Sequence, residues 1–115
     1  MENMVNNRKN TRHATLARAR VKSAFDGEAL LRDLSTSGCS IEYSANINIG
    51  QNMYYMMEIL PEKASLIESF ELEVSSRWVK NTANSCAIGF TITPQPKGSP
   101  FQRYLEYVTW RSSPV

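Results

Sequence analysis

The chain has 115 residues, of which 42% are hydrophobic and 21% charged, and its formal net charge is +2. This length suits one domain with a modest core and leaves no room for a separate catalytic domain. No run of about 18 apolar residues could cross a membrane, and the start of the chain lacks the apolar region of a signal peptide. We therefore expect a cytoplasmic protein without membrane insertion.

The positive charge is concentrated at the start of the chain. Residues 1–22 hold six basic residues and one acidic residue, whereas residues 23–115 hold seven basic and ten acidic residues. This distribution suits a small anionic ligand held by one segment better than a nucleic-acid polymer, which would need a broad basic face. Residues 1–13 are polar and show no apolar period, so we predict a flexible N-terminal arm before a folded domain over 14–115.

Residues that would serve metal or covalent chemistry are scarce. Cys39 and Cys86 do not have a metal-ligand spacing and there is a single histidine, so no zinc site is expected. Both cysteines lie in apolar, strand-like runs and are predicted to be buried thiols. The sequence contains no nucleophile elbow or phosphate-binding loop. We therefore expect neither an enzyme nor a bound cofactor.

Alternating side chains predict a series of short strands. From residue 14 to residue 25, small inward residues alternate with mostly basic ones, and Asp26-Gly27 is typical of a two-residue hairpin turn. The cleanest alternation follows Phe70. Strands are expected over residues 14–25, 28–34, 39–43, 51–60, 70–80 and 86–93.

The segment 51–60 is rich in methionine and can be interpreted as a helix or as a strand. Pro61 and the surrounding turns favour a strand, and we assign its methionines mainly to the core; these are Met53, Met56 and Met57.

A helix is predicted near the end of the chain. Three prolines and a glycine between residues 94 and 100 end the sheet, and apolar residues then recur at helical spacing over 101–111; these are Phe101, Tyr104, Leu105 and Val108. We expect this helix to lie against the open end of a barrel. The predicted fold is mainly β, a small antiparallel six-stranded β-barrel with a flexible N-terminal arm and a C-terminal helix.

The stretch 33–38 is the predicted centre of the functional site. Asp33 and Ser35 are two residues apart, so on an extended chain both side chains would leave the same face and meet a ligand rich in N–H donors. Gly38 stands where the chain must turn, and a glycine there permits positive φ and close approach of a ligand. The alternative is that Asp33 and Ser35 are ordinary turn residues that cap local backbone groups.

Two motifs together resemble a known signature. Arg8 and Arg12 form an R-x-x-x-R pair, and about twenty residues later Asp33, Ser35 and Gly38 form D-x-S-x-x-G. This combination is similar to the signature of PilZ domains, bacterial receptors for cyclic di-GMP. Arg8 to His13 could otherwise be a solvated charged tail.

The resemblance covers most of residues 8–110. Ile88-Gly89-Phe90 resembles the Gly–Phe pair near the end of a late strand in the family, and Trp78, with Arg77 beside it, is the candidate to stack on a base. Trp78 could instead be a core or surface residue of the barrel. Many family members have a further basic residue where this chain has Asn7, so one ligand or a stacked pair remain possible.

The resemblance also implies roles for the motif residues. Arg8 and Arg12 would bind guanine or phosphate through their planar guanidinium groups. Asp33 would accept hydrogen bonds from guanine N1–H and N2–H₂. Ser35 would donate to a phosphate or bridge to the arm.

The predicted function is that of a cyclic di-GMP receptor or adaptor. Ligand binding would order residues 6–13 and change the surface shown to a partner protein. Two alternatives remain. One is a ligand-independent adaptor of the PilZ type, and the other is a small barrel that binds single-stranded nucleic acid through the arm and Trp78.

Overall fold

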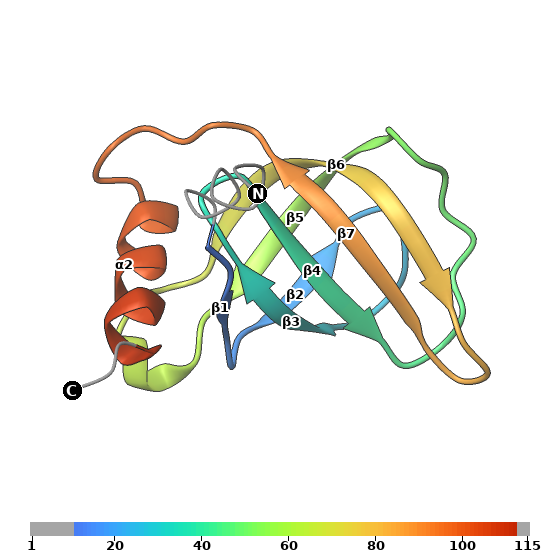
Figure 1. Ribbon diagram of the computed structural model, residues 1–115, viewed down its shortest axis with the longest axis horizontal. Coiled ribbons are helices and arrows are strands. Elements are labelled where there is room, and N and C mark those ends of the chain that lie inside the picture. Colours follow the sequence, from blue (N-terminus) through green and yellow to red (C-terminus); the bar gives the residue numbers. More distant parts are fainter. Residues whose placement is uncertain (1–10, 113–115) are drawn as a thin grey trace, which may run out of the picture.

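The computed structural model describes residues 11–112 of the chain, and residues 1–10 and 113–115 lie outside this description. Within residues 11–112 the chain forms seven strands, one short 3-10 helix and one α-helix (Figure 1). The strands are β1 (His13–Ala14), β2 (Arg18–Val21), β3 (Ala29–Leu34), β4 (Gly38–Tyr43), β5 (Tyr54–Leu60), β6 (Phe70–Asn81) and β7 (Cys86–Ile92). The 3-10 helix η2 (Lys63–Ser65) lies between β5 and β6, and α2 (Pro100–Ser112) follows β7.

Six of the strands close into an antiparallel barrel in the order β3-β2-β5-β6-β7-β4, and β4 pairs back onto β3. This confirms the predicted fold class. The seventh strand, β1, is an addition that pairs with the end of β3 through His13↔Leu34 and Ala14↔Asp33. As a result β3 has β1 and β2 along one side and β4 along the other.

Alternation along the strands builds the core, because successive side chains of a strand point to opposite faces. On β2 and just before it, Ala17, Ala19 and Val21 are buried while the basic residues between them are exposed, as predicted. Cys39 and Cys86 are both buried and unpaired, which confirms the prediction of buried thiols.

The first predicted strand and the turn after it differ from the structure. The segment 14–25 is divided into β1 and β2, and the connection from Val21 to Ala29 is too long for a two-residue hairpin. Positive φ occurs at Ser23 (69°) as well as at Gly27 (81°). Asp26-Gly27 is therefore one bend in a longer loop, where the Tyr43 hydroxyl donates to the Asp26 carbonyl oxygen at 2.8 Å.

The methionine-rich segment is a strand, as predicted, but its methionines are not all in the core. Met57 is fully buried, whereas Met53 is 51% exposed and Met56 40% exposed. Period-2 geometry explains the exposure of Met56, since Met57 faces inward and its neighbour must face outward. Met53 precedes the first residue of β5 and so lies outside the alternation of the strand.

The C-terminal helix confirms the predicted amphipathic pattern. Its buried residues are Phe101, Tyr104, Leu105 and Val108. Pro100 occupies the first position, which suits proline, and the Ser99 hydroxyl accepts a hydrogen bond from the Gln102 N–H at 3.2 Å, as a capping side chain does. Figure 1 shows α2 across one end of the barrel. No helix within residues 11–112 is long and apolar enough to cross a membrane.

Contacts at the end of α2 hold β1 in place. Arg111 donates to the Ala14 carbonyl oxygen at 2.7 Å and also forms an ion pair with Glu62, which precedes η2. The Tyr104 hydroxyl donates to Glu62 at 2.6 Å, and burial together with this carboxylate raises the pKa of Tyr104. The last helical turn is thus joined to the strand that begins directly after Arg12.

Candidate functional site

The centre of the candidate site is an ion pair between the two sequence motifs. Arg12 Nη1 lies 2.6 Å from Asp33 Oδ1, and the two side chains are 47% and 34% exposed. Arg12 directly precedes β1, whose Ala14 pairs with Asp33 in the ladder. The short strand β1 therefore brings together residues that are 21 positions apart in the sequence. Arg8, the other arginine of the first motif, lies outside the described residues.

Gly38 lies beneath the Arg12 guanidinium group. A Cβ at this position would lie 2.9 Å from the Phe90 carbonyl oxygen and 3.4 Å from Arg12 Nη2. The positive-φ glycines of the described chain are Gly27 and Gly98, so the proposed need for positive φ at Gly38 is wrong. Glycine is required here because β7 and Arg12 both approach the backbone closely.

Ser35 occupies a different environment from Asp33. It lies beyond the end of β3 and is 1% exposed. Its hydroxyl accepts hydrogen bonds from the Gly38 and Ser37 N–H groups at 3.1 and 3.3 Å, and it donates to the Gly38 carbonyl oxygen at 3.2 Å. The expected shared face is therefore wrong, because the alternation of the strand ends before Ser35. Ser35 caps the turn that presents Asp33 and Gly38.

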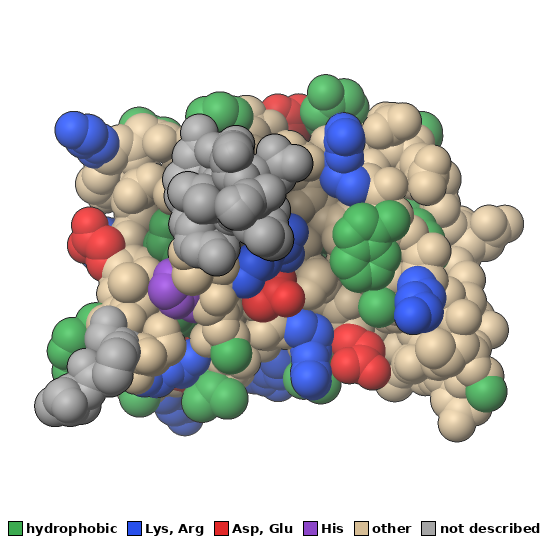
Figure 2. All heavy atoms as spheres, viewed as in Figure 1, with side chains coloured by type: hydrophobic (Ala, Val, Ile, Leu, Met, Phe, Trp, Pro, Cys, Tyr) green, Lys and Arg blue, Asp and Glu red, His purple; other side chains and the backbone are tan. Residues whose placement is uncertain are grey.

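Four residues on four adjacent strands form a row across the outside of the barrel. Asp33 on β3 pairs with Ser40 on β4, Ser40 pairs with Gly89 on β7, and Gly89 pairs with Trp78 on β6. Three interstrand spacings separate the ends of this row, about 14 Å. Figure 2 shows this face, where basic, acidic and hydrophobic side chains gather over β4 and β7.

Two bulges place the ends of the row on the outer face. The ladder shifts register between Leu31 and Asp33 on β3, and between Ser76 and Trp78 on β6. Leu31 and Ser76 are buried, so strict alternation would also have turned Asp33 and Trp78 into the barrel. A bulge inserts one residue and re-aims the side chain that follows it. Asp33 is partly exposed and Trp78 is 43% exposed.

The Trp78 indole lies over Gly89. A Cβ on Gly89 would be 2.2 Å from both Cε2 and Nε1 of Trp78. Trp78 is therefore a surface residue that leans across β7, and Arg77, at the bulge, is exposed. In the sequence, Gly89 stands out only through the family resemblance, and no motif marks Ser40. A glycine inside an apolar strand, which often marks close approach of another group, was the available signal.

The buried thiol of Cys39, beneath the ion pair, is expected to be unreactive. Cys39 follows Gly38 and is fully buried, and burial raises the pKa of its thiol to about 12. At neutral pH the thiol therefore stays protonated and is a poor nucleophile. It contributes to the core rather than to the chemistry of the outer face.

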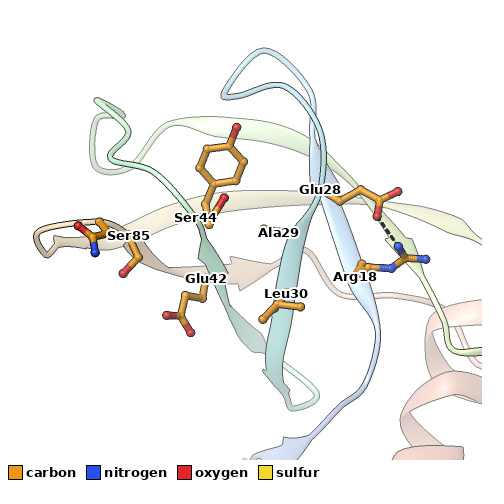
Figure 3. Close-up of a pocket in the computed structure, with 9 residues that line it drawn as sticks. Arg18, Glu28, Ala29, Leu30, Glu42, Ser44 and Ser85 are labelled. Atoms are coloured by element: carbon orange, nitrogen blue, oxygen red, sulfur yellow. Dashed lines mark ion pairs between the residues drawn. The ribbon is translucent and has the colours of Figure 1, made fainter.

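A separate hollow of about 370 Å³ lies on the outer surface by β2, β3 and β4 (Figure 3). Its charged lining residues already have partners, since Arg18 pairs with Glu28 at 2.7 Å and Glu42 with Arg32 at 3.6 Å. Of the motif residues that the structure describes, none lines it. The hollow and the Asp33 row are therefore different parts of the surface.

Comparisons with known proteins place the fold but not the ligand. No family model matches the sequence, and no curated protein does. Among solved structures, the chain is similar to the inhibitor of motility MotI/DgrA of Bacillus subtilis, with a TM-score of 0.69 and 15% sequence identity. The similarity covers 90% of this chain and 49% of that chain, so this protein spans about half the length of its structural neighbour. At this level of identity the shared property is the fold.

Proposed function

We propose that this protein binds cyclic di-GMP on the outer face of β3, β4, β7 and β6, and that it signals through a partner protein. The observation that carries this proposal is the row in which two bulges turn Asp33 and Trp78 outward, with Arg12 paired to Asp33. Bulges are over-represented next to functional sites, where they re-aim a side chain, and this supports a site on the row. The fold shared with an inhibitor of motility supports a regulatory role.

Guanine matches the chemistry of the Arg12–Asp33 pair. Its O6 and N7 atoms accept from an arginine, and its N1–H and N2–H₂ groups donate to a carboxylate. A guanine can therefore separate the pair while giving each charge a new partner, which avoids leaving an ionised group unsatisfied. Adenine has an amino group at the position of O6 and lacks N1–H and N2–H₂, so it cannot offer a pair of acceptors to the arginine and a pair of donors to the carboxylate.

The remaining contacts belong to the proposed signalling step. Arg8, by resemblance, would bind a phosphate or the second guanine, and ligand binding would fix residues 6–13 across the barrel. Ordering a residue costs about 1–2 kcal/mol of backbone entropy, and several charge-assisted hydrogen bonds to the ligand would offset that cost. The ordered arm would change the surface presented to a protein partner. Unchanged amide exchange over residues 6–13 on saturation would contradict this step.

Isothermal titration with cyclic di-GMP tests the proposal, with cyclic di-AMP and GTP as controls. We expect selective binding at micromolar affinity or tighter, and the fitted ratio distinguishes one ligand from a stacked pair. A folded protein that binds none of the three would instead support a ligand-independent adaptor. Steeply salt-dependent binding of a single-stranded oligonucleotide, without preference for the cyclic dinucleotide, would support the nucleic-acid alternative.

A further inference from the structure

Gly89 leaves a space that the Trp78 indole fills. The Cβ that any other residue would carry there would lie 2.2 Å from Cε2 and Nε1 and 2.7 Å from Cζ2 of Trp78. Such distances lie far inside van der Waals contact, so the indole can take this position only above a glycine. Trp78 nevertheless remains 43% exposed. Its ring is thus supported from below and open above.

The backbone of Gly89 does not itself require glycine. Its φ lies outside the left-handed region, because the positive-φ glycines among residues 11–112 are Gly27 and Gly98. It is paired in register with Trp78 on one side and Ser40 on the other. The reason for glycine is therefore the side chain above it rather than the shape of the strand.

The position of the indole brings it toward the Arg12–Asp33 pair. The ring starts from β6 but lies over β7, so two interstrand spacings, about 10 Å, separate it from Asp33. Ser40 is the residue of the row between them. Its side chain is half-buried and makes no hydrogen bond to another side chain or backbone group of residues 11–112. A hydroxyl thus stands in the middle of the row with its hydrogen-bonding capacity available.

We propose that Gly89 and Ser40 form the floor of a purine subsite. Gly89 is a positioning residue that holds the Trp78 indole over β7, and Ser40 supplies a hydroxyl beneath the base that lies between the indole and the Arg12–Asp33 pair. This inference rests on the proposed function and extends it, because it assigns two further residues to the site and gives each a distinct task.

The first test follows the indole without any ligand. The chain has two tryptophans, so in a Trp110→Phe background the fluorescence reports Trp78 alone. Gly89→Ala should displace the ring, shift its emission to longer wavelength and increase its quenching by acrylamide. An unchanged spectrum would overturn the role of Gly89 whether or not the protein binds the dinucleotide.

The second test measures affinity for cyclic di-GMP by titration. Gly89→Ala and Trp78→Ala should each weaken binding by about 5- to 30-fold, within the range known for base–aromatic stacking. The double variant should bind no more weakly than Trp78→Ala alone, because Gly89 acts through the indole. Additive losses, or wild-type affinity in Gly89→Ala, would overturn the inference.

The role of Ser40 is tested by two substitutions, one that removes its hydroxyl group and one that enlarges its side chain. Ser40→Ala should weaken binding by about 2- to 12-fold, the value of one hydrogen bond, and Ser40→Leu should weaken it much more by filling the floor. Equal affinity in Ser40→Leu and wild type would remove Ser40 from the subsite. Thermal melting of each variant establishes that it is folded, and absence of binding by the wild type would refute the proposed function itself.

Discussion

The basic residues near the start of the chain form two groups in different surroundings, and the comparison shows why only one of them is assigned to the ligand site. On β2 and directly after it, Arg18 and Arg20 pair with Glu28, Arg20 also contacts Glu58, and Lys22 pairs with Glu71. Within residues 11–112, the acidic partner of Arg12 is Asp33. The acidic partners of the first group lie just before β3, on β5 and on β6. Arg12 instead lies above a glycine, at the end of the row that leads to Trp78.

The difference lies in what surrounds each ion pair. The arginines of β2 meet the carboxylates of Glu28, which precedes β3, and of Glu58 on β5, so neighbouring elements already neutralise them. Gly38 lies beneath Arg12 and Ser40 is paired with Asp33, and because these residues have a small side chain or none, no bulky side chain of these two neighbours covers the surface beside the pair. A ligand can therefore reach both charges of this pair at once. A basic residue alone therefore does not indicate a binding site. A basic residue beside small side chains, which leave room for a ligand, does.

The largest expected effect is loss of ligand binding when the isolated pair is broken. Arg12→Ala and Asp33→Ala should each weaken cyclic di-GMP binding by about 10- to 150-fold, because each removes charge-assisted hydrogen bonds to the base. Titration calorimetry measures the change, and Arg18→Ala is the matched control. Equal losses in Arg12→Ala and Arg18→Ala would erase the contrast between the two groups.

The two tryptophans provide the next contrast, since both are exposed but only Trp78 lies in the row. Trp78→Ala should weaken binding by about 5- to 30-fold. Trp110, which is 72% exposed on α2, should be replaceable by alanine without loss. Competition titrations of both variants under one set of conditions provide the measurement. Loss in the Trp110 variant would place the ligand near the helix instead.

Replacing Gly38 or Gly89 by alanine should change the free energy of unfolding by different amounts. At Gly38 the added Cβ meets a backbone carbonyl oxygen, which cannot turn aside, and we expect about 1–3 kcal/mol of lost stability. At Gly89 it meets a side chain that can rotate away, so stability should change little. Urea denaturation of both variants gives the comparison. A stable Gly38→Ala protein would mean that β4 and β7 can separate slightly at this point.

The smallest effect is expected on β2. Arg20 is half exposed and pairs with Glu28 and Glu58, and exposed ion pairs contribute only about 0–1 kcal/mol. Arg20→Ala should therefore shift the denaturation midpoint slightly, with less shift at high salt. A loss of more than about 2 kcal/mol in the free energy of unfolding would show that these ion pairs contribute substantially to closing the barrel.

The sequence predicted the barrel and its helix because their signals are local. Alternation on β2 and the helical spacing of Phe101 and Val108 depend only on near neighbours. It misplaced Met53 and Met56, since an apolar segment does not reveal which of its residues face outward. The prediction of a two-residue turn at Asp26-Gly27 was also wrong, because the length of that loop depends on where β2 ends.

The site was predicted in part, and the missing part depends on non-local pairing. Arg12, Asp33 and Gly38 come together as the two motifs implied, whereas Ser35 turns inward. Alternation from Phe70 would place Trp78 in the core, and only the bulge at Arg77 turns it outward. Trp78 is aligned with Gly89 by the register between β6 and β7. No local sequence pattern specifies which residues of two strands face each other.

The contact between Arg111 and the Ala14 carbonyl oxygen joins residues 97 positions apart, nearly the whole described chain. Contacts between residues far apart in the sequence form more slowly than local ones, so this contact is expected to form after the local hairpins of the barrel. The strand that follows Arg12 would then dock last during folding and detach first during partial unfolding. The barrel and the ion pair would thus differ in their kinetics, with a durable scaffold carrying a more labile site at its edge.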